Sequence, residues 1–214
     1  MRMSVVKWHG ELIGQKVVEA LKKNGFDAIY CSSCNEAVEY VLQYVQKRSR
    51  VGFGGSMTLE TLQLAQRVEA KGGIVLNHNR PGLGPEEKLE IQREEILCDL
   101  FLCSINAVTL DGWLVNVDGV GNRVAALTFG PKKVIALVGK NKICSDISVA
   151  LNRIKTLAAP MNCKRLNLDN PCIKTGTCMD CASNSRICRV YSVMVRRPMS
   201  SDITVVLVGE DLGF

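Results

Sequence analysis

The stretch Arg50-Val51-Gly52-Phe53-Gly54-Gly55-Ser56-Met57-Thr58 joins a short apolar strand directly to a helix through two glycines and a serine. Successive glycines let the backbone curl at the end of a strand so that its N–H groups converge, and Ser56 or Thr58 can cap the helix or bind a ligand through its hydroxyl. The corner predicts an anion site made of Gly54, Gly55, Ser56, Met57 and Thr58. A tight turn with a capping serine and no ligand explains the same residues equally well.

Helix and strand patterns alternate on both sides of this corner. Before it, we expect a helix that ends near Gly25, a strand over 28–31 and a second helix around 38–45. After it, we expect a helix to Gly72, a strand over 74–77, a helix from Pro85, strands over 100–104 and 133–138, a helix capped by Ser145 or Asp146 that Pro160 ends, and a strand over 203–208. The turn Leu110-Asp111-Gly112 predicts a β-hairpin over 107–117. The sequence therefore predicts an α/β fold: an open, mostly parallel sheet with helices on both faces and an antiparallel hairpin insertion.

A second glycine-rich turn follows the predicted hairpin at once. Asn116 to Arg123 crowd two glycines, two amides, an acid and an arginine between apolar segments. A hairpin turn accounts for Asp118-Gly119, but an arginine beside such a turn can recognise a carboxylate or phosphate with two hydrogen bonds. We take as further ligand candidates Asn116, Gly119, Gly121, Asn122 and Arg123, with Arg80 as a weaker one in its own Pro/Gly loop.

Composition excludes several classes of protein. The chain has 214 residues, a formal net charge of +6, 47% hydrophobic and 22% charged residues, which is ordinary globular composition rather than that of a disordered or fibrous chain. Its start lacks a signal-peptide pattern, and no apolar run approaches the ~18 residues of a membrane span. We expect one cytoplasmic domain over residues 1–214.

Cysteine and positive charge coincide in the segment 161–198, which we call the cysteine-rich segment. It holds five of the 10 cysteines and seven Lys or Arg against two Asp. Cys172, Cys178, Cys181 and Cys188 give four sulfurs within one short stretch, enough for a zinc ion or an iron–sulfur cluster. The surrounding basic residues have the sign of charge that lowers thiol pKa values.

Other interpretations of the cysteines stay open. The thiols can pair as disulfides in air, and a basic cysteine-rich segment can be a nucleic-acid knuckle, although Tyr191 is the only aromatic residue near it. The pair Cys31 and Cys34 is more typical of ordinary thiols than of a redox motif, and Cys98, Cys103 and Cys144 are expected in the core. His9 and His78 stand alone in the sequence.

Several motifs together resemble the LUD-domain (lactate-utilisation) family. They are Val51 to Thr58, Asn116 to Arg123, Phe129-Gly130-Pro131-Lys132-Lys133-Val134, Asn170-Pro171-Cys172 through Cys188, and the ending Val208-Gly209-Glu210-Asp211-Leu212-Gly213-Phe214. The resemblance runs over nearly the whole chain and is strongest to the stand-alone subgroup with C-terminal cysteines. It implies the fold of glucosamine-phosphate deaminase, ribose-phosphate isomerase and the CoA transferases, whose corresponding corner binds the anionic group of the substrate. It also implies work beside iron–sulfur oxidoreductase subunits that convert lactate to pyruvate.

Three functional hypotheses follow. The first is a protein of lactate-type organic-acid metabolism that binds a small carboxylate or phosphorylated metabolite between Gly54–Thr58 and Asp118–Arg123. The second is an isomerase or acyl transferase with Asp118 or Glu60 as acid and base, although the acid-rich catalytic loop of the sugar-phosphate isomerases has no counterpart here. The third is a redox or metal-stabilised module at the four cysteines, without catalysis of its own. Neither a membrane nor a nucleic acid is an expected partner, and a homo-oligomer is compatible with the sequence.

Overall fold

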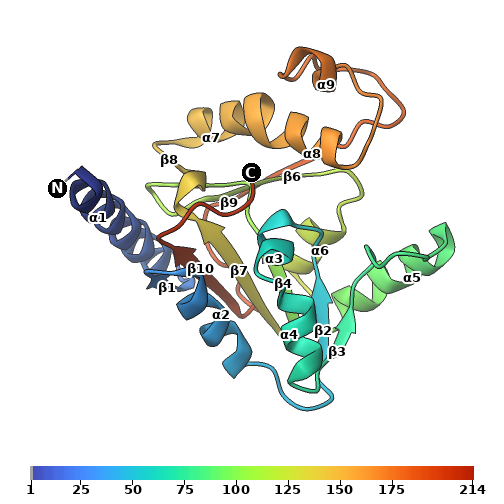
Figure 1. Ribbon diagram of the computed structural model, residues 1–214, viewed down its shortest axis with the longest axis horizontal. Coiled ribbons are helices and arrows are strands. Elements are labelled where there is room, and N and C mark those ends of the chain that lie inside the picture. Colours follow the sequence, from blue (N-terminus) through green and yellow to red (C-terminus); the bar gives the residue numbers. More distant parts are fainter. Residues whose placement is uncertain (1) are drawn as a thin grey trace.

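A six-stranded parallel sheet forms the centre of the computed structural model, which describes residues 2–214 and, for residues 2–4, the backbone only. The strand order is β1-β10-β7-β4-β2-β3, and each neighbouring pair runs parallel (Figure 1). The strands are β1 Asp27–Cys31, β2 Arg50–Phe53, β3 Ile74–Leu76, β4 Leu100–Ser104, β7 Lys133–Gly139 and β10 Ile203–Val208. The predicted parallel α/β sheet is confirmed.

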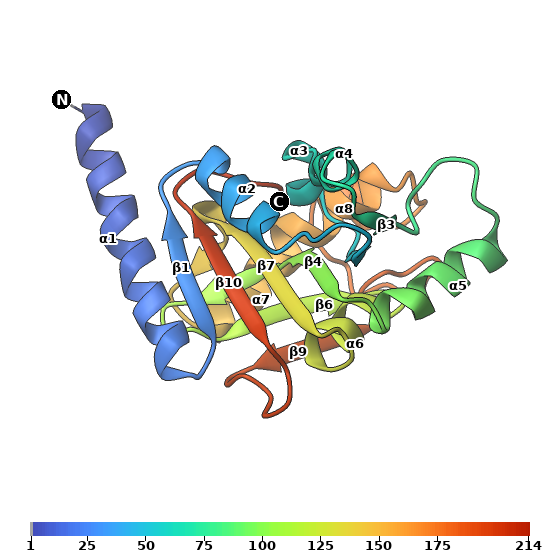
Figure 2. The same ribbon diagram turned by 90° about the horizontal axis from the view of Figure 1, so that it is seen from below.

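Alternating apolar residues give the sheet two buried faces. On β4, Leu100 and Leu102 pack on one side with helices α2 Cys34–Gln43, α3 Met57–Thr61 and α4 Leu64–Ala70. Phe101 and Cys103 pack on the other side, which is covered by α1 Arg2–Lys23, α6 Asn122–Thr128 and a second sheet. Figure 2 shows α1 along the edge strand β1, while α5 Pro85–Ile96 extends from the opposite edge.

The predicted hairpin is part of a second sheet of four strands, in the order β8-β5-β6-β9. Strands β5 Ala107–Thr109 and β6 Leu114–Asp118 pair antiparallel, as predicted. The two outer strands, β8 Ile143–Cys144 and β9 Val190–Met194, were not predicted. Strand β9 lies inside the cysteine-rich segment, and its sequence lacks the strict alternation of apolar and polar residues that identifies a strand.

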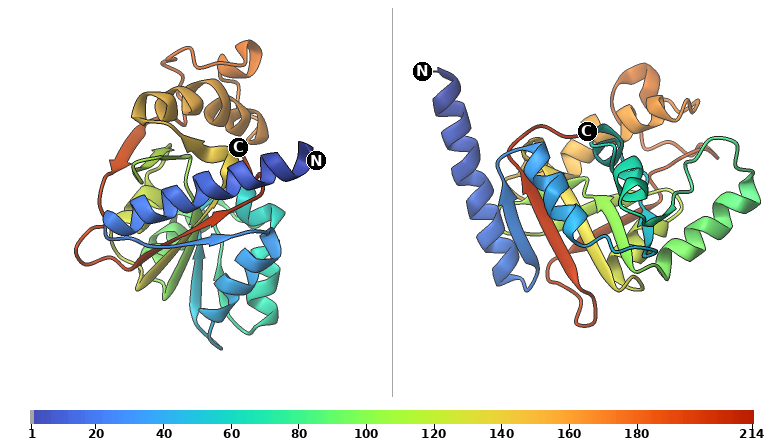
Figure 3. Two further views of the ribbon diagram at one scale, coloured as in Figure 1. Left: turned by 90° about the vertical axis from the view of Figure 1, so that its left-hand side faces the viewer. Right: turned by 60° about the horizontal axis from the view of Figure 1, so that its bottom comes forward.

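A helical layer covers the second sheet on its other side (Figure 3). It begins with α7 Ile147–Arg153, capped by the side chain of Asp146, and continues through a π-helical turn, Ile154–Ala158, into α8 Ala159–Arg165. The prediction that Pro160 ends this helix is wrong. Proline lacks an N–H and its ring clashes with the carbonyl four residues earlier, and the widened turn before it lets the helix continue.

Two local predictions are corrected by the structure. The helix expected from the Gly-Gly-Ser corner to Gly72 is split into α3 and α4, because Gln63 adopts a left-handed conformation with φ of 51°. The segment expected to be a simple turn at Asp118–Asn122 leads straight into α6, and Gly121, with φ of 92°, precedes its first residue. Within residues 2–214, no helix is long and apolar enough to cross a membrane.

Candidate functional site

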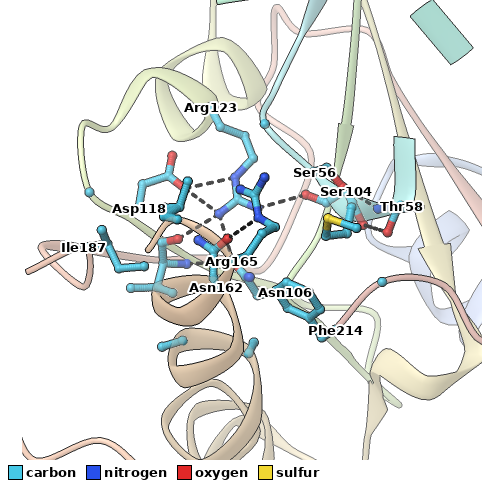
Figure 4. A pocket seen from close by; sticks show the side chains of 18 of the residues that line it. Ser56, Thr58, Ser104, Asn106, Asp118, Arg123, Asn162, Arg165, Ile187 and Phe214 are labelled. Atoms are coloured by element: carbon cyan, nitrogen blue, oxygen red, sulfur yellow. Dashed lines mark hydrogen bonds and ion pairs between the residues drawn. The ribbon is translucent and has the colours of Figure 1, made fainter. Parts of the chain in front are cut away.

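A pocket of about 210 Å³ opens beyond the carboxyl ends of β2 and β4 and is bounded by β6 and α8. Parallel sheets of this kind bind ligands outside the carboxyl ends of their strands, where loops and helix starts converge. Its polar lining comes from segments far apart in the sequence, and Figure 4 shows several of these side chains. The polar residues that line the pocket include Ser56, Thr58, His78, Asn79, Ser104, Asn106, Asp118, Asn122, Arg123, Lys142, Asn162 and Arg165.

The Gly-Gly-Ser corner forms one wall of the pocket. Ser56 caps α3 by accepting a hydrogen bond from the Thr58 N–H at 3.2 Å. A Cβ atom on Gly55 would lie 2.8 Å from Asn79 Nδ2, and one on Gly54 would lie 3.1 Å from Cys103 Cβ. Neighbouring side chains therefore pack closely against both glycines, and a larger residue at either position would have to displace them. Because α3 has only five residues, its dipole contributes less to an anion site than the sequence suggested.

Arg123 is bound by the protein on most of its donors. Its Nε donates to Asp118 Oδ1 at 2.9 Å, and Nη2 donates to the same oxygen. Nη2 also donates to Asn106 Oδ1 and to the Val117 carbonyl, each at 2.8 Å, and Nη1 donates to the Ser104 carbonyl at 3.2 Å. The guanidinium thus ties β4, β6 and α6 together, with one N–H of Nη1 left over (Figure 4). Its charge is neutralised by Asp118.

Asp118 is in turn held as an acceptor. Its Oδ1 receives Arg123, and its Oδ2 receives the Val124 N–H at 2.9 Å at the start of α6. Both carboxylate oxygens of Asp118 are therefore engaged as acceptors of hydrogen bonds from the protein itself. Glu60, the other acid considered in the sequence, does not line the pocket, and half of its side chain is exposed.

Lys142 is the buried cation of the pocket. It ends a short 3-10 turn after β7, is 3% exposed, and donates through Nζ to Thr58 Oγ1 and Ser104 Oγ, each at 3.0 Å. Burial, together with the positive charges of Arg153 and Arg123, lowers the pKa of Lys142 to about 7. No ion pair joins Lys142 to a carboxylate within residues 2–214.

Arg165 supplies a second side-chain cation from α8. Its Nε donates to Asn162 Oδ1 at 2.9 Å, and Nη1 lies 3.4 Å from Glu60 Oε1. The long distance and the exposure of Glu60 make this a weak ion pair. In Figure 4, Arg165 and Asn162 approach from the side opposite the backbone of Arg123. Arg165 therefore keeps donors available toward the pocket.

His78 does not stand alone, contrary to the sequence analysis. Its Nδ1 lies 2.8 Å from Oε1 of Glu95, which is 1% exposed, and Asn79 Nδ2 lies 3.2 Å from its Nε2. Asn79 Nδ2 can only donate, so Nε2 accepts and the proton of the neutral ring lies on Nδ1, which donates to Glu95. The partner was not recognisable in the sequence because Glu95 lies near the end of α5, beside the exposed Glu94, where an acid is expected at the surface.

The structure brings most of the predicted ligand residues to this pocket. Gly55, Ser56, Met57 and Thr58 line it from one side and Asp118, Gly119, Asn122 and Arg123 from the other. Five predicted site residues do not line it: Gly54, Glu60, Arg80, Asn116 and Gly121. Asn116 is fully buried behind the pocket, where its Oδ1 accepts the Asn106 N–H, and Arg80 donates to the Val75 carbonyl at the surface.

Sequence reasoning missed the polar residues that follow other strands. His78 and Asn79 follow β3, Ser104 and Asn106 end and follow β4, and Lys142 follows β7. A usable signal existed, because polar residues directly after the carboxyl ends of parallel strands gather at one edge of the sheet. Asn162 and Arg165 carried no such signal, since they reach the pocket only because the helix continues past Pro160.

The cysteine-rich segment forms a separate, small cavity beside α8. Cys172, Cys178, Cys181 and Cys188 all border it, together with Cys163. All ten cysteines of the chain are free thiols. Within residues 2–214, no group of three or more His, Cys, Asp or Glu side chains is close enough to hold a metal ion. The thiols therefore share one cavity without forming a closed coordination site.

At two of these thiols the pKa is raised rather than lowered, contrary to our expectation. Burial, together with the neighbouring thiols, raises the pKa of Cys172 and of Cys188 to about 11. Arg186 is the charged group that opposes this effect at Cys188. Arg189 and Arg197 instead donate to backbone carbonyls.

The Cys31 and Cys34 pair has no activated thiol. Burial raises the pKa of each to about 11, and the Cys34 thiol donates to Glu210 Oε2 at 3.4 Å. A nucleophilic cysteine needs the opposite shift. The other three cysteines predicted to lie in the core, Cys98, Cys103 and Cys144, are buried as expected.

Comparison with known proteins identifies the family. The LUD domain family matches residues 14–208 of the chain. Among solved structures, the crystal structure of a DUF162 family protein from Deinococcus radiodurans is similar, with a TM-score of 0.53 and 13% identity over 93% of this chain and 98% of the other. At this identity the likeness concerns the fold. No curated protein matches the chain. Since the family match spans the central sheet, the pocket and the cysteine-rich segment, this chain belongs to the LUD-domain family.

Proposed function

We propose that this protein binds a small organic anion, a carboxylate or phosphorylated metabolite of lactate-type metabolism, in the pocket between the Gly-Gly-Ser corner and α6. An imbalance of buried charge supports this proposal. Asp118 neutralises Arg123, but of the other two pocket cations Lys142 has no carboxylate partner among the ion pairs of residues 2–214 and Arg165 has only the half-exposed Glu60. Burying unpaired positive charge is costly, and an anionic ligand offsets that cost.

The cations expected to contact the ligand differ from those suggested by the sequence. Arg123 donates most of its hydrogen bonds to Asp118 and to backbone carbonyls, so its main contribution is to fix the shape of the pocket. Arg165 and Lys142 keep donors that face the cavity, and the neutral groups of Asn122 and Ser56 lie beside them. A planar guanidinium suits recognition of a carboxylate with two hydrogen bonds.

Calorimetry on the wild-type chain and two variants tests this function. Lactate, pyruvate and sugar phosphates are titrated, with Arg165→Gln as the variant and Lys164→Gln as its neighbour on the exposed side of α8. The loss of a charged hydrogen bond is expected to weaken binding about 10- to 100-fold for Arg165→Gln. Lys164→Gln should bind as the wild type does. Absence of binding by every anion, or equal affinity in both variants, contradicts the proposal.

We also propose that the thiols around the small cavity hold zinc or an iron–sulfur cluster. The convergence of five cysteines from α8, α9 Cys172–Thr175 and the following loop favours it. Two N–H groups already point at sulfur, since Asn170 Nδ2 donates to Cys163 and the Asp180 N–H donates to Cys178, each at 3.4 Å. Such donors stabilise thiolates in metal sites. Because the thiols do not form a closed site, metal binding requires the loop after α9 to tighten.

Anaerobic purification with metal analysis and a visible absorption spectrum tests the cysteine proposal. Iron with a broad band in the visible region indicates a cluster for electron transfer, and zinc without colour indicates a structural site. Cys181→Ser should abolish metal content, whereas Cys98→Ser, at a core thiol away from the cavity, should retain it. A preparation that contains neither metal refutes this proposal and leaves the anion pocket unaffected.

A further inference from the structure

Lys142 has a bonding position at its nitrogen that the protein does not use. Ser104 Oγ donates its single hydrogen to the Leu137 carbonyl at 2.7 Å, so it can only accept from Lys142. Thr58 Oγ1 directs its hydrogen to Ser104 Oγ or to the Leu212 carbonyl, and it likewise accepts from Lys142. Two N–H groups of Lys142 are thereby fixed. The third position, an N–H in the ammonium or a lone pair in the amine, has no partner among residues 2–214, and Lys142 borders the pocket.

The surroundings of Lys142 favour the amine. The side chain is almost completely buried, and the nearby charges of Arg153 and Arg123 repel a further proton. These causes lower the pKa of Lys142 to about 7, so a large share of the molecules carries a lone pair at neutral pH. The two hydroxyls are matched by the two N–H groups of a neutral amine, which orients that lone pair. An oriented, desolvated amine is the form in which lysine acts as a nucleophile.

We propose that Lys142 captures a small 2-oxo acid in this pocket as a protonated imine. The inference rests on the proposed anion-binding function, because Arg165 would receive the carboxylate of the same ligand. The amine lone pair attacks the carbonyl carbon, and the carbonyl π pair moves to oxygen. One of the two amine protons and one proton from the solvent leave with that oxygen as water, and the other amine proton stays on the iminium nitrogen. No electrons are gained or lost, and no co-reactant other than that solvent proton is required.

The geometry also sets the class of ligand. The pocket of about 210 Å³ has room for a compound of a few heavy atoms, and its cationic lining requires an anionic group. The amine requires a carbonyl carbon within the same small molecule. After capture, the iminium keeps one N–H, which can remain bonded to Ser104 or Thr58. The structure thus assigns the two hydroxyls a positioning role for Lys142.

Reductive trapping tests the inference on the intact chain. Pyruvate, the simplest ketone of this class, is added with sodium cyanoborohydride, which reduces the imine to a stable amine, and the adduct is located by peptide mass spectrometry. We expect one adduct per chain on the peptide that contains Lys142. Lactate has the same carboxylate but a hydroxyl in place of the carbonyl, and it should give no adduct. Lys142→Met should lose the adduct, and Lys140→Met, on the same 3-10 turn but outside the pocket, should keep it.

Mapping on the wild type makes the test independent of whether a variant folds. Adducts spread over exposed lysines, with none enriched at Lys142, overturn the inference. If pyruvate binds in the calorimeter but no adduct forms at Lys142, the covalent step is refuted while the proposed function stands. If pyruvate neither binds nor forms an adduct, and the other anions also fail to bind, both are refuted.

Discussion

The anion pocket and the cysteine-lined cavity gather their side chains in different ways. The pocket takes Thr58, Ser104 and Lys142 from three different strand ends, and the hydrogen bonds of the parallel sheet fix their relative positions. The cavity takes its thiols from one short segment held by α8, the four-residue helix α9 and a loop. The core of the parallel sheet holds the first site in place. The second site is held mainly by contacts within its own segment.

The ion pairs of the two regions also differ in how deeply they are buried. In the pocket, the buried Arg123 is paired with Asp118 and bonded to backbone carbonyls of two strands. In the cysteine-rich segment, the ion pair of Lys174 and Asp169 is exposed and 3.8 Å long. Buried pairs are expensive to break and exposed pairs are not.

The largest expected effect is on the buried pair. Arg123→Leu leaves Asp118 charged and buried without its partner, and we expect it to lower the free energy of unfolding by about 3–5 kcal/mol. Urea denaturation followed by circular dichroism measures the change. Lys174→Met, which removes an exposed partner in the cysteine-rich segment, should leave the urea midpoint unchanged. If both substitutions change the free energy of unfolding equally, the buried and the exposed ion pair do not differ in strength.

The second effect concerns pH. The pKa of Lys142 is about 7 in the folded state and near 10.5 when the chain unfolds, so between these values the native state binds fewer protons than the unfolded state. Lys142 therefore makes the free energy of unfolding rise with pH above about 7, and its full penalty is present below that. Lys142→Met should be more stable than the wild type at pH 7, by a few kcal/mol at most, in the order of magnitude set by the pKa shift.

Urea midpoints at several values between pH 7 and pH 8.5 check this prediction. The advantage of Lys142→Met should shrink as pH rises, because the wild type loses the penalty and the variant has none to lose. Cysteines of the unfolded chain, with a pKa of about 8.5, begin to ionise in this range, but they do so in both proteins and their effect cancels in the difference. A constant difference between the two proteins across this range would contradict the lowered pKa.

The third prediction compares the stability of the backbone around the two sites. If metal organises the cysteine-lined cavity, a strong chelator should speed hydrogen exchange of backbone amides in residues 166–189. Amides of β4 and β7 should exchange as slowly as before, because the sheet core supports them. Exchange measured by mass spectrometry with and without chelator decides this. Unchanged exchange in both regions would mean that the cavity needs no metal for its order.

The smallest effect is at the rim of the pocket. Glu60→Gln removes the weak partner of Arg165, 3.4 Å away and half exposed, and frees the guanidinium for the ligand. We expect anion affinity to increase by about two- to threefold, the size of a surface ion pair. Calorimetry measures it against the wild type. A loss of affinity would instead show that Glu60 organises the site by holding Arg165 in place.

A feature of this fold could be predicted from the sequence when the residues that specify it are close together in the chain. Local patterns specify Asp146 as a helix cap, the hairpin of β5 and β6 and the buried parallel strands, because caps, turns and apolar runs act over a few residues. The continuation of the helix through Pro160 and the break at Gln63 were not predictable, since packing overrides local preference at both points.

By itself, the sequence determined the parallel α/β sheet, the glycine corner and the grouping of the cysteines in one segment, because each of these is encoded by neighbouring residues. Only the tertiary structure decided which charges are paired. It bound Arg123 to Asp118, gave His78 its partner Glu95, and left Lys142 between two hydroxyls without a counter-ion. The physical reason is that burial and pairing are properties of the assembled core: His78 and Glu95, 17 residues apart in a loop and a helix, meet only when the chain has folded.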